Sequence, residues 1–203
     1  MHVPMTDTSE LNIMSYESAE MLSSSDSYDR KKWIYIPDFY TEYRYVLGTR
    51  GRHPVICAGI NPSTAEPDNL DPTLKSVSRI AASNGRDSWL MFNVYAQRAT
   101  RPDDMDSVRN EILHRENMLA FHALLEMASR NGEVPLIWAA WGAIIEKRNW
   151  LKLCVHDMYE TALPYHAEWV CAGKCSMKGH PHHPLYLRRN EQFHSFDIGG
   201  YLR

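Results

Sequence analysis

Two asparagines and a group of histidines are the side chains of this sequence best suited to chemistry on a small polar ligand. Asn61 precedes Pro62 in a tight turn, where its amide oxygen can orient a water molecule. Asn93 offers a hydrogen-bond donor and an acceptor together, which suits the edge of a heterocyclic base. His180 and His183 can each donate to a developing anion, and their spacing leaves open which of them acts. These residue types can position a water molecule and stabilise an anion, so they are candidates for a polar ligand site.

These residues follow short apolar runs that alternate with segments of helical period. Four runs, each with the length of a buried strand, occupy residues 54–60, 88–94, 135–141 and 168–171. The first intervening helix is predicted to start at Asp71, a good N-cap before Pro72. Two further helices are expected within residues 107–130 and 143–158. The alternation predicts a three-layer α/β/α fold with a central four-stranded, mostly parallel sheet, whose ligand site lies beyond the carboxyl ends of the strands.

The composition fits one folded domain. The chain has 203 residues, of which 44% are hydrophobic and 23% charged, as is typical of globular proteins. Residues 1–29 are rich in Ser, Met and acidic side chains, so we expect an acidic mobile tail, or a loosely docked cover, before a single domain at residues 30–203. No apolar run is long enough to cross a membrane and no secretory pattern is visible, so we expect a cytoplasmic protein without membrane contact.

The net charge of −3 is unevenly distributed along the chain. Residues 1–29 contain six acidic side chains and no Lys or Arg, so the remaining residues together carry a charge of +3. The segment from Lys174 onward holds five basic side chains, two acidic ones and four histidines. This C-terminal segment could therefore face an anion, and the overall acidity does not exclude DNA as a partner.

The four cysteines are expected to be reduced thiols rather than a disulfide framework. They are Cys57, Cys154, Cys171 and Cys175. The last two precede His180, His182 and His183, and this cluster keeps a zinc hydrolase open as an alternative. A Cys-x3-Cys spacing on a strand does not converge as Cys-x2-Cys on a turn does, so we expect no metal and no cofactor.

Four short motifs together resemble the uracil-DNA glycosylase superfamily. Residues 59–62 read Gly-Ile-Asn-Pro, as in its mismatch-specific branch, and residues 90–93 resemble the strand that delivers a base-reading Asn. Residues 141–142, Trp-Gly, resemble the end of its third strand. Residues 180–185 approximate its final His-Pro-Ser-Pro-Leu motif with one residue more. Over residues 43–188 the chain is still more similar to a bacterial and phage family of undefined function that looks like a glycosylase offshoot.

The resemblance implies a monofunctional DNA glycosylase of uracil-DNA glycosylase-like fold, which flips a pyrimidine and hydrolyses its N-glycosidic bond. No Lys adjoins the motifs, so hydrolysis by water is expected rather than a Schiff-base step. The implied catalytic residues are Asn61 and either His180 or His183. The implied base-binding residues are Ser63, Thr64, Asn93, Tyr95 and Arg98. The implied DNA-binding residues are Leu185, an apolar wedge, with Tyr186, Arg188 and Arg189.

Ser63 bears on which base such an enzyme would release. It stands where classical uracil enzymes of the superfamily carry a Tyr that excludes substituents on carbon 5 of the base. The smaller side chain implies a base larger than uracil. Some glycosylases of the type that the chain resembles act on modified bases such as glucosylated hydroxymethylcytosine in phage DNA, so the resemblance implies a modified pyrimidine and a role in antiviral defence. Two alternatives stay open: a non-catalytic module that binds a modified base or nucleotide, and a uracil or mismatch repair glycosylase. DNA is the expected partner, and the protein is expected to be a monomer without an obligate protein partner.

Overall fold

The computed structural model describes residues 7–23 and 26–203, which form one seven-stranded mixed sheet with helices on both faces. The strand order is β1-β2-β4-β3-β5-β6-β7. The strands are β1 (Trp33–Ile36), β2 (Val46–Thr49), β3 (Pro54–Gly59), β4 (Ser88–Asn93), β5 (Leu136–Ala139), β6 (Glu168–Ala172) and β7 (Phe193–Ser195).

The four strands predicted from the apolar runs lie side by side at the centre of this sheet, as β4, β3, β5 and β6, and all three of their pairings are parallel. The α/β class is therefore confirmed. The prediction of a four-stranded sheet is wrong, because β1 and β2 extend one edge and β7 the other, each paired antiparallel. The aromatic side chains of residues 32–47 alternate only partly around Pro37, which is compatible with two short strands or an irregular edge element, and the structure has the two strands β1 and β2 there. Strand β7 has only three residues and no clear sequence signature.

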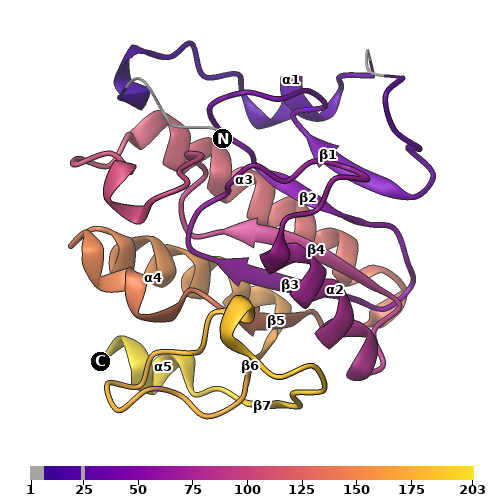
Figure 1. Ribbon diagram of the computed structural model, residues 1–203, viewed down its shortest axis with the longest axis vertical. Coiled ribbons are helices and arrows are strands. Elements are labelled where there is room, and N and C mark those ends of the chain that lie inside the picture. Colours follow the sequence, from indigo (N-terminus) through magenta and orange to yellow (C-terminus); the bar gives the residue numbers. More distant parts are fainter. Residues whose placement is uncertain (1–6, 24–25) are drawn as a thin grey trace.

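Helix α2 (Pro72–Ser83) covers one face of the sheet, and α3 (Glu111–Ala128) and α4 (Leu151–Ala162) cover the other (Figure 1). Asp71 caps α2 as predicted, because its carboxylate accepts a hydrogen bond from the Leu74 amide at 2.8 Å. Asn110 caps α3 in the same way. The third predicted helix is split into a 3₁₀ segment, Gly142–Lys147, and α4. A short helix, α5 (Ile198–Leu202), follows β7.

The described part of residues 1–29 is docked on the domain. It contains a 3₁₀ turn, Thr8–Glu10, and a short helix, α1 (Tyr16–Glu20). The Tyr16 amide donates to the buried Glu116 carboxylate of α3 at 2.9 Å, and the Tyr16 ring packs in the core. The expected mobile tail is thus anchored over residues 7–23, whereas residues 1–6 and 24–25 of that prediction lie outside the described residues.

None of the helices in the described ranges has both the length and the apolar character needed to span a bilayer.

Candidate active site

The carboxyl ends of the central strands converge on a cavity of about 360 Å³, here called the Asn–His cavity. It is bounded by the loop after β3, the end of β4, the N-terminus of α2 and the segment after β6. Its lining includes seven predicted site residues: Asn61, Ser63, Thr64, Asn93, His183, Leu185 and Tyr186. Three distant stretches of sequence therefore meet where a parallel sheet is expected to bind its ligand.

Asn93, the last residue of β4, is completely buried, yet neither atom of its amide group has a hydrogen-bond partner within the described residues. Its backbone carbonyl accepts a hydrogen bond from the Asn117 side chain at 2.9 Å, which fixes the strand end. A Cβ at Gly59 would lie 3.0 Å from the Asn93 amide oxygen, so the glycine leaves the space that this side chain occupies. A buried amide costs free energy when it is unpaired, so Asn93 is placed to pair with a ligand.

Asn61 lies on the loop after β3, and hydrogen bonds fix the orientation of its amide group. Its Nδ2 donates to the carbonyl of Pro62 at 2.9 Å and to that of Ala99 at 2.8 Å. Within residues 7–23 and 26–203, its Oδ1 has no hydrogen-bond partner. The residue therefore presents an acceptor at the wall of the cavity, as required for orienting a water.

His183 precedes the 3₁₀ turn Pro184–Tyr186 and lines the same cavity. Its Nδ1 accepts a long hydrogen bond from the Leu185 amide at 3.4 Å, which favours the tautomer with the proton on Nε2. Burial lowers the pKa of the His183 imidazole, and the Asp71 carboxylate opposes that shift. Gly142, at the end of the β5 segment, lies directly against His183. A neutral imidazole with a free Nε2–H can donate to a carbonyl oxygen without carrying a charge.

His180 does not reach the cavity, which corrects the prediction that left both histidines open. It is 3% exposed, and both ring nitrogens have partners: Nδ1 lies 2.9 Å from the Tyr201 hydroxyl and Nε2 lies 3.1 Å from the Glu146 carboxylate. This histidine ties its loop to α5 and to the Gly142–Lys147 turn. Of the two, His183 is the one placed to act on a ligand.

Two of the predicted base-binding residues also lie outside the cavity lining. Tyr95 is buried, donates to Asp106 at 2.6 Å and accepts from the Asn110 amide at 3.0 Å. Arg98 lies behind the loop after β3, where it donates to the Ser63 and Ala65 carbonyls and to the Tyr35 hydroxyl. Both side chains are hydrogen-bonded within the protein, although the buried Arg98 Nε has no partner among the described residues, and neither side chain lines the cavity.

Of the four predicted DNA-binding residues, Leu185 and Tyr186 line the cavity, and Arg188 and Arg189 do not. Leu185 is 46% exposed and Tyr186 is 76% exposed, although both line the cavity. Arg188 and Arg189 follow them and are exposed.

Sequence reasoning missed several residues of the lining, notably Arg44, Asp71, Met91 and Ile144. Asp71 was predicted only as a helix cap, although the first helix after a strand begins near the ligand in this fold class. Arg44 precedes β2, which pairs with β4, and nothing in its local sequence marks it as a site residue.

The Cys–His cluster considered for zinc does not assemble. Cys171 and Cys175 have their sulfur atoms 3.7 Å apart, but His180 and His183 face different partners. Among the residues whose placement is described, no three His, Cys, Asp or Glu side chains are grouped so as to hold a metal ion.

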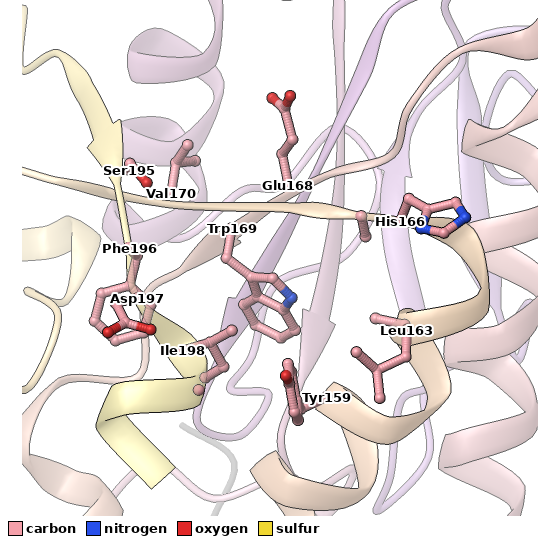
Figure 2. A pocket seen from close by; sticks show the side chains of 13 residues that line it. Tyr159, Leu163, His166, Glu168, Trp169, Val170, Ser195, Phe196, Asp197 and Ile198 are labelled. Atoms are coloured by element: carbon pink, nitrogen blue, oxygen red, sulfur yellow. The ribbon is translucent and has the colours of Figure 1, made fainter. Parts of the chain in front are cut away.

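A larger cavity of about 790 Å³ lies near the opposite end of β6, and we call it the Trp169 cavity. Figure 2 shows the Trp169 indole extending toward the side chains of Ile198 and Tyr159. The α4–β6 connection and the start of α5 form its walls, and it shares no lining residue with the Asn–His cavity.

Comparison with known proteins identifies a family for this chain. A family model described as "Protein of unknown function (DUF1643)" matches residues 44–185, well over half of the chain. The chain belongs to this family. The matched region of this DUF1643 member contains β2 to β6, Asn61, Asn93 and His183. No curated protein and no solved structure matches the chain.

Proposed function

We propose that this DUF1643 protein is a monofunctional DNA glycosylase that removes a flipped pyrimidine and leaves an abasic site. The observation that supports this most is Asn93, whose buried amide has a free donor and a free acceptor in a cavity that also contains Asn61 and His183. A pyrimidine edge offers the complementary acceptor and donor, and a flipped base would satisfy both.

The proposed reaction assigns one step to each polar side chain. Asn61 Oδ1 accepts a hydrogen bond from a water and holds it beside carbon 1′ of the sugar. The water oxygen bonds to that carbon as the bond from carbon 1′ to the base nitrogen breaks and its electron pair leaves with the base. His183 Nε2–H donates to a base carbonyl and stabilises the negative charge that develops there. The water's spare proton leaves to solvent or to the departing base, since an amide cannot accept it as a carboxylate would.

The preferred base is proposed to be a pyrimidine with a substituent on carbon 5. A cavity of about 360 Å³ is within the range of pockets that enclose whole small ligands, and the Ser63 side chain leaves its wall open. Glucosylated hydroxymethylcytosine in phage DNA is a base of this kind. We also propose that the protein is a monomer that acts in antiviral defence in the cytoplasm. Its central parallel strands are proposed to form a variant of the uracil-DNA glycosylase fold.

The test is an incubation of the protein with duplexes that contain uracil, hydroxymethylcytosine or its glucosylated form. Alkali then breaks the strand at abasic sites, and mass spectrometry identifies the released base. We expect release from at least one duplex and its loss, by on the order of 10²-fold or more, in the Asn61→Ala variant, with DNA affinity within about twofold. A protein that shifts these duplexes but releases no base would be the non-catalytic binding module, and equal loss of binding and release in the variant would make Asn61 structural.

A further inference from the structure

Arg44 is a buried cation in the wall of the Asn–His cavity. It is 2% exposed, and its Nη1 donates to the Ala65 carbonyl at 3.1 Å. Its Nε is buried without a hydrogen-bond partner, and within residues 7–23 and 26–203 the guanidinium makes no ion pair. Burial and the neighbouring Arg98 lower the pKa of Arg44 to about 9, so the side chain is still charged at neutral pH.

The surroundings of Arg44 add positive charge. Arg98 donates to the same Ala65 carbonyl at 3.3 Å, so two guanidinium groups lie beneath the loop after β3. The Asp71 carboxylate lines the same cavity and partly offsets this charge, since its attraction raises the pKa of Arg44, but within the described residues the two side chains form no ion pair. A buried guanidinium without an ionic partner is unfavourable unless a ligand supplies the opposite charge.

We infer that Arg44 forms an anion subsite in the Asn–His cavity, which binds a carboxylate or phosphate group of the ligand. The hydroxyl groups of Ser63 and Thr64 line the same cavity and can donate to such an anion. Because Arg44 is nearly inaccessible from outside, the anion must enter as part of the ligand. An acidic substituent on carbon 5 of the base is the expected source, which is a narrower class than the uncharged glucosyl group named above, and this choice of source rests on the proposed function.

Binding of free bases tests the subsite without requiring catalysis. Calorimetry compares uracil with 5-carboxyuracil on the wild-type protein and on Arg44→Gln, with Arg52→Gln as a matched control, because Arg52 is exposed, precedes β3 and does not line the Asn–His cavity. We expect 5-carboxyuracil to bind the wild-type protein and the control at least about tenfold more tightly than uracil, and the preference to vanish in Arg44→Gln. If Arg44→Gln does not fold, Arg44→Lys is used instead. It keeps a positive charge but cannot form a bidentate hydrogen bond with a carboxylate, so it should retain only part of the preference for 5-carboxyuracil.

Deoxyuridine 5′-phosphate distinguishes the two sources of the anion. If Arg44→Gln weakens binding of this nucleotide while wild-type affinity for the two free bases is equal, the subsite binds a nucleotide phosphate and not a substituent of the base. Equal wild-type affinity for uracil, 5-carboxyuracil and the nucleotide would overturn the subsite. Failure of the glycosylase proposal looks different: no duplex would release a base, while the dependence of anion binding on Arg44 would persist.

Discussion

The two cavities of this protein differ in size and in how their polar groups are satisfied. The Trp169 cavity is about 790 Å³ and the Asn–His cavity about 360 Å³. Of the buried polar atoms without partners in the described ranges, none belongs to the lining of the larger cavity, whereas Asn93 and Arg44 contribute three to the smaller one. Volume alone arises wherever elements pack imperfectly, but unpaired polar atoms cost free energy. The smaller cavity is therefore the better candidate for a functional site.

The same contrast separates two histidines only three positions apart. Both ring nitrogens of His180 have partners in the protein, while His183, which lines the cavity, has a partner only at Nδ1 within the described residues. If this difference in hydrogen bonding matters for function, substitution of His183 should affect base release and substitution of His180 should affect stability.

The largest expected effect is on base release in His183→Ala. Loss of the donor to the leaving base should reduce the release rate by on the order of 10²-fold or more, while the melting temperature stays nearly unchanged. His180→Ala should behave in the opposite way. It removes two buried hydrogen bonds and should lower the free energy of unfolding by about 1–3 kcal/mol, with release per folded molecule within about threefold of wild type.

Single-turnover release assays and denaturant unfolding of both variants check this pair. Reversal of the pattern, with His180→Ala inactive and stable, would show that the loop rearranges when DNA binds. An unchanged rate in both variants would remove the histidines from the reaction.

The second-largest expected effect, on the choice of base, comes from substitutions that place a large side chain in each cavity in turn. Ser63→Tyr places a ring in the Asn–His cavity and should reduce release of a 5-substituted pyrimidine by about tenfold or more relative to uracil, because the space for the substituent is lost. Ser195→Tyr places the same ring beside the Trp169 cavity and should leave both rates unchanged. Competition between the two base types in one reaction directly measures the ratio of their release rates. If Ser195→Tyr changes the ratio and Ser63→Tyr does not, the functional cavity has been misassigned.

Much of this arrangement could be predicted from the sequence because its causes are local. Apolar runs predicted the four parallel strands, and the Asp71-Pro72 cap predicted the start of α2. Because β3 and β4 are parallel neighbours, Asn61 and Asn93 then lie together at the carboxyl ends of these strands. Other features depend on contacts between distant residues. Whether His180 or His183 faces the ligand is decided by Tyr201 and Glu146, and Arg98 is turned toward backbone carbonyls that only the folded loop brings near. Such partners leave no periodic signal in the sequence.

The smallest expected effect concerns the stability of the Asn–His cavity itself. Asn93→Leu keeps a similar volume and removes two buried polar atoms that have no partner in the described part of the chain. It should therefore raise the free energy of unfolding by about 1 kcal/mol while base release is lost. Gln97→Met is the matched control, because Gln97 is equally buried but both its amide atoms pair with Asp106, at 3.0 and 2.7 Å.

The control variant should lose about 1–3 kcal/mol of stability, since the buried Asp106 would be left short of partners. Urea unfolding of both variants beside the wild-type protein measures the difference. A fall in stability in Asn93→Leu comparable with that in Gln97→Met would mean that the Asn93 amide is already satisfied in the free protein, and its availability to a ligand would then lose its physical basis. A gain in stability accompanied by loss of release would instead identify Asn93 as a residue whose polarity is kept for a ligand at the expense of the fold.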